Sequence, residues 1–215
     1  MPVFAIGGVR SDAIALKVLT LVDKPKPRLL FVGTASAELP KTAAWIDELY
    51  GDAAEVSHLQ FFPWPPADLR ELVLAQDIVL VGGGNTANML AVWRTHGFDA
   101  VLREAWERDI LLTGWSAGAI CWFEAGVTDS FGPQLEGMEC LGFLPGSACP
   151  HYDGEELRRP RYAALLRSDF PAGIGIEDDV GVRFDGTELT QVVSTREGAT
   201  AYRVSRDGEV ALEPS

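Results

Sequence analysis

One short segment has the residue types and the spacing of a hydrolytic nucleophile. The apolar run 110–113 leads into Gly114-Trp-Ser-Ala-Gly118, which matches the pattern Gly-x-Ser-x-Gly. We expect a buried strand, a sharp turn and a buried helix that continues through 120–123. The glycines two before and two after Ser116 leave room for the neighbouring chain, and the hydroxyl then stands clear at the carboxyl end of a sheet. The pattern predicts Ser116 as a nucleophile, against the alternative of a serine that caps a helix.

A glycine-rich turn could supply the oxyanion hole. A second predicted buried strand opens into Gly82-Gly-Gly-Asn-Thr86 and then a helix, and the spacing is not that of a phosphate-binding loop. The N–H groups of Gly83 or Gly84 can approach a carbonyl oxygen closely, because no Cβ intervenes. Ala117, directly after the nucleophile, would supply the second N–H. We place Asn85 beside the substrate, and the alternative is a glycine turn in which Asn85 only caps the helix.

A serine nucleophile needs a base, and the sequence has three histidines. His58 lies in a strand-like segment before a proline-rich loop, and His96 ends a predicted helix. His151 lies in the turn-rich segment 145–154, a kind of loop that often carries catalytic groups on a rigid scaffold. We therefore predict His151 as the base, against the alternative of a surface-loop histidine.

The acid that would orient His151 has two candidates. Glu177 follows a short apolar strand, at the carboxyl end where a sheet-borne acid would reach the histidine, and it is the favoured choice. Asp129, which lies before the histidine loop, is the alternative. Asp178 and Asp179 stand beside Glu177 and could be solvated turn acids.

The elements that must position these residues alternate along the first half of the chain. Short runs with apolar residues on both parities predict parallel strands buried on both faces, and these are 3–6, 29–32, 78–81 and 110–113. Between them helical spacing predicts helices at 11–21, 42–50, 67–75, 87–95 and 99–108. Strands joined by turns follow, as an antiparallel C-terminal edge of the same sheet, at 174–176, 181–184, 188–193 and 201–204. The sequence predicts one α/β domain over 1–215, a mostly parallel sheet with helices on both faces.

Composition excludes several classes of function. The net charge of −13 disfavours nucleic acid and anionic membranes as partners, and no apolar run is long enough for a membrane span. The N-terminus has no basic segment before its short apolar run and reads as a strand instead of a signal peptide. Three cysteines without paired spacing give neither a disulfide framework nor a zinc pattern. We expect a cytoplasmic protein.

Three motifs together resemble a known family. Gly82-Gly-Gly-Asn-Thr86, Gly114-Trp-Ser-Ala-Gly-Ala119 and Pro150-His151 are similar to segments of dipeptidase E and its relatives, which include cyanophycinase. The resemblance implies a flavodoxin-like fold of the class I glutamine amidotransferase type. It also implies a serine peptidase with a Ser-His-acid triad and an acyl-enzyme, without a metal or other cofactor. The resemblance does not decide whether the protein forms a homodimer.

The same resemblance implies a substrate. Dipeptidase E cleaves dipeptides with an N-terminal aspartate, and its aspartate-binding arginine follows the histidine in a segment similar to 156–162. On that match Arg158 holds the substrate carboxylate, while Arg159 and Arg161 are close enough to exchange roles. Three arginines within four positions are also unusual in so acidic a chain, and a guanidinium suits bidentate capture of a carboxylate. The alternative is that the three arginines only form the solvated, basic first turn of a helix.

Three other functions remain as alternatives. One is a serine hydrolase of the same fold with another amide or ester substrate. Another is a non-catalytic, amidotransferase-like domain that binds a small ligand. An α/β-hydrolase fits less well, because that fold usually places its acid before its histidine, whereas Glu177 follows His151.

Overall fold

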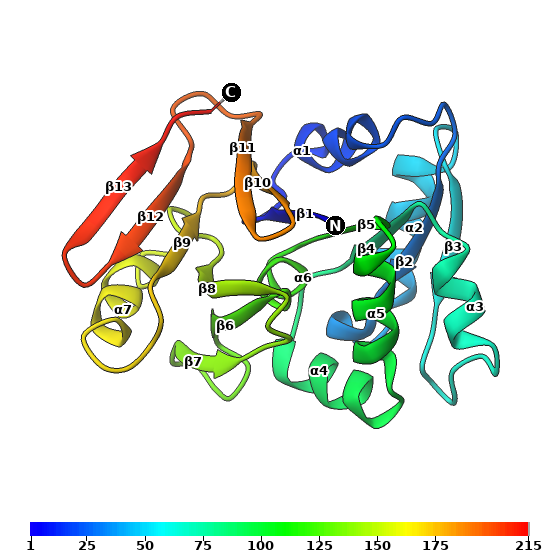
Figure 1. Cartoon of the computed structure of the whole chain (residues 1–215), viewed down its shortest axis with the longest axis horizontal. Coiled ribbons are helices and arrows are strands. Elements are labelled where there is room, and N and C mark those ends of the chain that lie inside the picture. Colours follow the sequence, from blue (N-terminus) through cyan, green and yellow to red (C-terminus); the bar gives the residue numbers. More distant parts are fainter. Residues whose placement is uncertain (215) are drawn as a thin grey trace.

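The computed structural model describes residues 1–214, and two β-sheets form its framework (Figure 1). The strands of the first sheet are β1 (Pro2–Ile6), β2 (Arg28–Val32), β3 (Glu55–Leu59), β4 (Ile78–Val81), β5 (Leu111–Trp115), β10 (Val180–Asp185) and β11 (Glu188–Ser194). Their order is β11-β10-β1-β5-β4-β2-β3. The pairs from β1 to β3 are parallel, and β10 and β11 are antiparallel. The predicted parallel sheet is therefore confirmed, and β1 lies in its interior.

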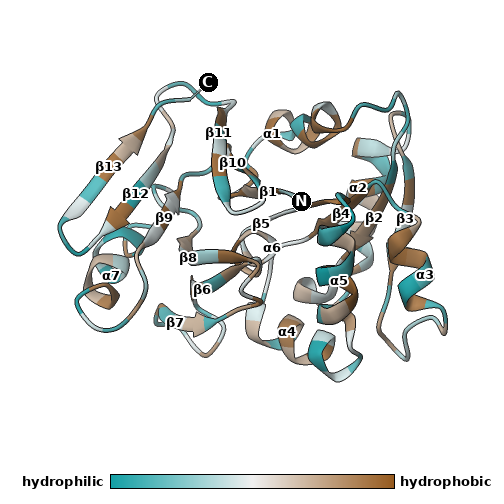
Figure 2. Ribbon diagram, viewed as in Figure 1, coloured by the Kyte–Doolittle hydropathy of each residue, from teal (hydrophilic) through white to brown (hydrophobic). Residues whose placement is uncertain are grey.

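Helices cover both faces of this sheet, as the apolar pattern predicted. Alternate residues of β1 face opposite sides, and the hydropathy colouring shows how strongly apolar the strands are (Figure 2). Phe4 and Ile6 pack on the first two helices, whereas Val3 and Ala5 share a core with the others. The helices are α1 (Asp12–Lys17), α2 (Pro40–Tyr50), α3 (Leu69–Leu74), α4 (Thr86–Thr95) and α5 (Phe98–Glu107), with short 3-10 helices at Val18–Leu21 and Thr34–Ser36.

A second sheet takes up most of the other half of the chain. Its strands are β6 (Phe123–Thr128), β7 (Glu136–Glu139), β8 (Leu144–Cys149), β9 (Gly173–Ile176), β12 (Ala201–Ser205) and β13 (Gly208–Leu212), and the helix α7 (Arg158–Leu165) packs beside them. The order is β13-β12-β9-β8-β6-β7, with β6, β8 and β9 parallel.

This second sheet corrects two expectations. Of the predicted C-terminal edge strands, only β10 and β11 join the first sheet, while β9, β12 and β13 belong to the second. The helix after Ser116, α6 (Ala117–Ile120), is one turn long, and the chain enters β6 at Phe123 instead of continuing as a helix. The apolar run 120–123 did not reveal this change, because short buried helices and buried strands have the same composition.

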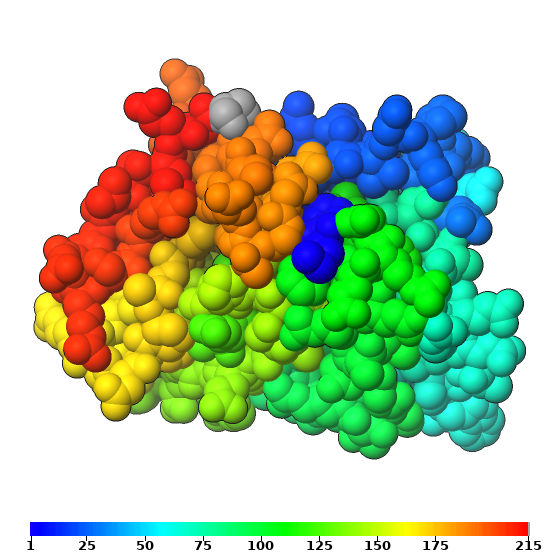
Figure 3. Space-filling view, viewed as in Figure 1, coloured from blue at the N-terminus to red at the C-terminus, as the bar shows by residue number. Residues whose placement is uncertain are grey.

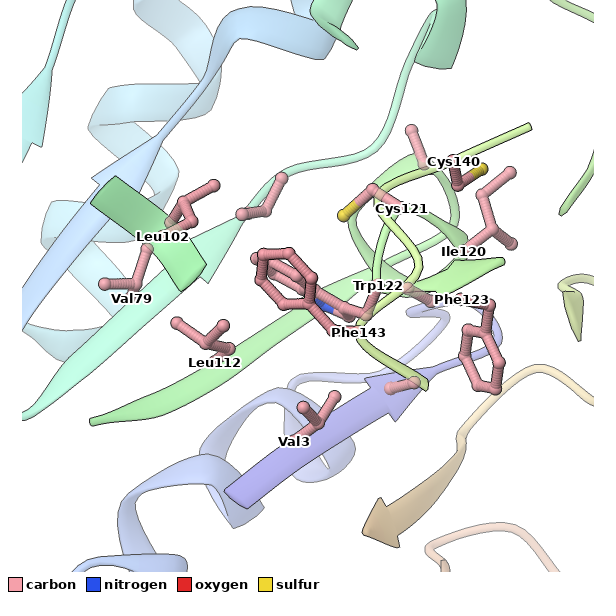
Figure 4. Packing of buried hydrophobic residues seen from close by; sticks show 14 of the residues in the cluster. Val3, Val79, Leu102, Leu112, Ile120, Cys121, Trp122, Phe123, Cys140 and Phe143 are labelled. Carbon is pink, nitrogen blue, oxygen red and sulfur yellow. The ribbon is translucent and has the colours of Figure 1, made fainter. Parts of the chain in front are cut away.

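The two sheets share one hydrophobic core, and the turn after β5 is set in it (Figure 4). Leu112 of β5, Val79 of β4 and Leu102 of α5 lie beside Trp122 and Phe143, whose ring centroids are 5.9 Å apart. Burial of aromatic side chains contributes strongly to stability, so this core holds α6 rigidly beneath the site.

On the surface, the first residues emerge between the segments around 180–190 and 100–110 (Figure 3), as expected for a chain that begins with an interior strand. Within residues 1–214, no helix combines the length and the apolar character that crossing a membrane requires.

Candidate active site

Ser116 occupies a strained turn at the carboxyl end of β5. Its φ of 55° and ψ of −112° are unusual for a residue with a side chain, and strain of this kind collects at functional sites. A Cβ on Gly114 or Gly118 would overlap the carbonyl oxygen of Val81, so both glycines are required where the turn meets β4. The amide of Ser116 donates to Ile6 O at 3.1 Å. The hydroxyl therefore stands between the ends of β1 and β4, as the motif predicted.

The glycine turn after β4 lies against the nucleophile. A Cβ on Gly83 would stand 3.3 Å from Ser116 Cβ. Among the described residues, no oxygen accepts a hydrogen bond from the amides of Gly83, Gly84 or Ala117. Gly84, at φ 140°, packs tightly on the backbone of Ala35. Unpaired N–H groups on both sides of a hydroxyl are what an oxyanion hole requires, and Gly83 and Ala117 are the pair beside the serine.

Asn85 does not face the substrate with free groups. Its Oδ1 accepts from Asn88 N at 2.8 Å, which caps α4, and its Nδ2 donates to Ser130 O at 2.9 Å. The prediction of a substrate contact was wrong, because both polar atoms of the side chain are engaged within the protein. Ser130 Oγ also accepts from Ala87 N at 3.2 Å, so these bonds tie the loop after β6 to the turn that carries the glycines.

His151 forms a dyad with Asp178. The distance between His151 Nδ1 and Asp178 Oδ1 is 2.7 Å, and the histidine has a φ of 52°. An ionised carboxylate can only accept, so Nδ1 carries the proton and Nε2 is left as the basic atom. A Cβ on Gly8 would lie 2.6 Å from Nδ1, and Gly8 O accepts from Asp179 N at 2.8 Å. The dyad thus packs on the glycines that follow β1, two residues beyond the carbonyl that binds the nucleophile's amide.

Glu177, the favoured acid, does not contact His151. Its carboxylate accepts from Arg159 Nη2 at 2.7 Å and from Thr200 N at 2.9 Å. Consecutive residues of an extended segment face opposite sides, so Asp178 turns toward the histidine and Glu177 turns away. The predicted segment was right, and the residue within it was wrong by one position.

The alternative acid and the other histidines also lie away from the dyad. The Asp129 side chain is exposed in the loop after β6 and has no hydrogen bond among the described residues, so it does not orient the histidine. His58 Nε2 pairs with Asp47 at 2.7 Å. His96 follows α4 and packs on Phe61.

Asp178 is held on several sides. Arg10 Nε donates to its Oδ2 at 2.6 Å, its amide donates to Asp153 Oδ1 at 2.9 Å, and Arg196 Nη2 donates to its carbonyl oxygen at 3.1 Å. Burial by itself would raise the pKa of Asp178, but the hydrogen bonds from His151 and Arg10 outweigh burial and lower this pKa below its usual value. Asp178 is therefore ionised near neutral pH. Sequence reasoning did not find Arg10.

Arg158 is not available to a substrate. It is 3% exposed, its Nη1 donates to Val127 O at 3.1 Å, and its Nε pairs with Glu155 at 2.7 Å. The helix explains this placement, since Arg158 and Tyr162 lie one turn apart on the buried face of α7. The role that the resemblance implied for Arg158 is therefore corrected.

The other two arginines of the cluster differ from each other. The guanidinium of Arg159 is enclosed by aromatic rings and carboxylates. Arg161 is exposed; its Nε donates to Leu135 O at 2.5 Å, and its two terminal nitrogens have no partner among residues 1–214. It borders a pocket of about 340 Å³, which is lined by Pro133, Gln134, Leu135, Leu157, Pro160, Arg161 and Ala164.

Comparison with known proteins places this site in a family. The model of peptidase family S51 matches residues 5–192. The chain belongs to peptidase family S51. It is a serine-type peptidase, and the resemblance to dipeptidase E is confirmed.

Individual relatives of this S51 peptidase agree in sequence and in fold. The uncharacterized peptidase YgaJ of Bacillus subtilis (strain 168) is 42% identical over 213 residues, which cover 94% of this chain and 91% of that protein. Peptidase E of Shewanella amazonensis (strain ATCC BAA-1098 / SB2B) is 30% identical over 140 residues, 64% of this chain and 54% of the relative. The crystal structure of a peptidase from an acI-B1 Actinobacterium has a TM-score of 0.72 at 19% identity, with 100% and 94% of the two chains covered, and confirms the fold.

Proposed function

We propose that this S51 peptidase hydrolyses dipeptides with an N-terminal aspartate through Ser116, His151 and Asp178. One observation carries the proposal. A strained serine and a His-Asp dyad both pack on the end of β1, the serine on Ile6 O and the dyad on Gly8. Among the described residues, Ser116 Oγ and His151 Nε2 have no hydrogen-bond partner, and such catalytic bonds commonly tighten only when substrate is bound.

The first half of the reaction forms an acyl-enzyme. His151 Nε2 takes the proton of Ser116 Oγ as this oxygen attacks the scissile carbonyl carbon. The carbonyl oxygen becomes an oxyanion, and the N–H groups of Gly83 and Ala117 donate to it. Collapse of this intermediate breaks the C–N bond, and the imidazolium gives its proton to the leaving amine. Asp178 stabilises the charged ring without taking the proton.

The second half regenerates the serine. A water molecule loses a proton to His151 Nε2 and attacks the ester carbon, and the proton then passes to Ser116 Oγ as the acid product leaves. The same two N–H groups serve the second oxyanion. Each donor contributes about 3 kcal/mol to lowering the barrier in comparable enzymes.

Arg161 is the arginine that fits a substrate carboxylate. Its two terminal nitrogens have no hydrogen-bond partner within residues 1–214, and a planar guanidinium suits a carboxylate. Its pocket lies between the loop after β6, which Ser130 ties to Asn85 beside the glycine turn, and the start of α7, the helix that follows the histidine loop. A substrate whose carbonyl is at Ser116 could therefore place an acidic side chain in this pocket.

A panel of dipeptides tests the proposal. Purified protein is assayed for free amino acids with Asp-Leu, Asn-Leu, Glu-Leu, Ala-Leu and Leu-Leu. We expect Asp-Leu to be the best substrate, with kcat/KM at least about tenfold above that of Asn-Leu, because a lost charge-assisted hydrogen bond costs about 1.5–3 kcal/mol. Equal cleavage of Ala-Leu and Asp-Leu would refute the aspartate preference, while the serine mechanism would stand.

A further inference from the structure

Arg159 lies where three segments of the chain meet: its own segment with Tyr152, the segment of Glu177, and the β12–β13 hairpin. It is the second residue of α7, and its guanidinium carbon lies 4.5 Å from the ring centroid of Tyr152 and 4.4 Å from that of Tyr202 on β12. Stacking on aromatic rings restricts the guanidinium, and 36% of the side chain is exposed. The group is therefore fixed in a slot between the two tyrosines.

All three nitrogens of this guanidinium are engaged. Nε donates to Tyr152 O at 3.3 Å, Nη2 donates to Glu177 Oε1 at 2.7 Å, and Nη1 pairs with Glu209 Oε1 on β13. Tyr152 Oη donates to the other oxygen of Glu209 at 2.7 Å. These partners leave Arg159 poorly suited to hold a substrate carboxylate, the role that sequence reasoning had left open to it.

Two partners of Arg159 are the chain neighbours of the dyad. Tyr152 directly follows His151, and Glu177 directly precedes Asp178. The two segments share one backbone bond at this point, from Tyr152 N to Ile176 O at 3.1 Å. The bond from Asp178 N to Asp153 Oδ1 also joins them. Arg159 adds a side-chain link, since it donates to Tyr152 O and to Glu177, so the two segments cannot separate without breaking it.

We propose that Arg159 is a positioning residue that holds His151 and Asp178 in register, with Glu209 of the C-terminal hairpin completing the clamp. The inference rests on the proposed function, in which His151 acts as the base for Ser116. In this proposal the β12–β13 hairpin helps to position the dyad, because its residues Tyr202 and Glu209 contact the Arg159 guanidinium. A shift of about 1 Å in a catalytic group can cost about a hundredfold in rate, so such a link matters without touching substrate.

The test compares Arg159→Ala with Arg203→Ala in the full chain. Arg203 lies next to Tyr202 on β12, is exposed and has no partner in the described part of the chain, so it is a matched control. For Arg159→Ala we expect kcat on Asp-Leu to fall about thirtyfold with KM within about twofold, since only orientation is lost. Added guanidinium chloride at non-denaturing concentration should restore part of kcat by filling the slot. Arg203→Ala should match the wild type.

Three results would overturn the clamp. These are an unchanged kcat, a raised KM with an unchanged kcat, which would make Arg159 a substrate ligand, and a loss of kcat that guanidinium does not restore. If Arg159→Ala does not fold, Arg159→Lys and Glu209→Gln replace it. Each keeps part of the clamp, so kcat should lie between the wild-type value and one-thirtieth of it.

A proton NMR measurement separates this inference from the proposed function. The Nδ1–H proton of His151, bonded to Asp178, should give a downfield resonance that Asp178→Asn removes. We expect Arg159→Ala to weaken or broaden this resonance and Arg203→Ala to leave it unchanged. If the wild type hydrolyses no peptide but the resonance depends on Arg159, the proposed function fails and the clamp stands. A resonance that is unchanged in Arg159→Ala refutes the clamp whatever the activity.

Discussion

His151 Nδ1 lies 2.7 Å from Asp178 Oδ1, although the two residues are 27 positions apart in the sequence. β9 and β8 make this contact, because they run parallel in the second sheet and end side by side. The histidine follows β8 and the aspartate follows β9, so both side chains emerge at one edge. Ser116 approaches from the other sheet. The site thus lies where the carboxyl ends of strands from two sheets meet around β1.

Asp178 should matter most among the three acids considered. Asp178→Asn should lower kcat about a thousandfold or more, because an amide cannot stabilise the imidazolium or hold the required tautomer. Asp129→Asn should stay within about twofold of the wild type, since its side chain is exposed and unpaired among the described residues. Steady-state kinetics on Asp-Leu measures both. A larger loss in Asp129→Asn than in Asp178→Asn would contradict the dyad.

Acid should weaken the folded protein in a way that depends on Arg10. The pKa of Asp178 is lower in the folded protein than its usual value, so this group stabilises the fold above an unfolded pKa of about 3.9. That contribution is lost as the pH falls through the lower, folded pKa. Arg10→Met removes one cause of the shift, so the folded pKa should rise toward the unfolded value. The contribution of Asp178 should then be smaller, and it should be completely lost at a higher pH than in the wild type.

Thermal unfolding between about pH 3 and pH 7 measures this effect. The Tm of Arg10→Met should fall by less than the wild-type Tm over this range and should level off at a higher pH, while the Tm of Arg203→Met should follow the wild type. Curves of the same shape for Arg10→Met and the wild type would show that Arg10 does not act on Asp178.

Substitution of Arg161 should change substrate specificity, whereas substitution of Arg158 should change stability. Arg161→Met should reduce the preference for Asp-Leu over Asn-Leu to near unity and leave hydrolysis of a small activated ester unchanged. Arg158→Met should keep the preference but destabilise the fold by about 1–3 kcal/mol, because Val127 O loses its buried donor. The ratio of kcat/KM for Asp-Leu to that for Asn-Leu measures the preference, and urea unfolding measures the stability. Loss of the preference in Arg158→Met alone would restore the role implied by the resemblance.

The three cysteines should be unreactive in the folded protein. Burial raises the pKa of Cys140 and of Cys149 to about 12, and that of Cys121 lies well above its usual value for the same reason. Little thiolate exists near neutral pH, so a thiol reagent such as DTNB should label none of them until denaturant exposes them. Ser116→Cys is the control, since it should add one rapidly labelled thiol. Rapid labelling of the native wild type would contradict the packing.

The sequence was most informative where local pattern and chemistry coincide. The Gly-x-Ser-x-Gly turn around Ser116 needs its glycines for close approach to Val81, and this requirement is visible as a motif. The strands β1, β2, β4 and β5 of the first sheet contain continuous apolar runs, which burial on both faces explains, whereas the edge strand β3 is partly polar. His151 was found because it lies in a turn-rich loop, whereas His58 lies in a strand and His96 caps the end of a helix.

The remaining features depend on contacts that local patterns do not encode. Glu177 and Asp178 have the same chemistry in adjacent positions, and only the direction of the strand end decides which one meets the histidine. The phase of α7 similarly buries Arg158 and exposes Arg161. The second sheet was missed because its strands β6 and β8 contain polar residues and glycine instead of continuous apolar runs, and they are joined by pairing between distant parts of the chain.

Covalent labelling of the native protein with a fluorophosphonate tests the central claim most directly. Intact-mass and peptide mass spectrometry should show a single adduct, located on Ser116, with slower labelling in His151→Ala. A folded Ser116→Ala variant should remain unlabelled, because among the described residues Ser116 is the hydroxyl at the strained turn that, like the dyad, packs on the end of β1. An adduct on a different residue, or equal labelling of Ser116→Ala, would contradict the assignment of Ser116 as the nucleophile.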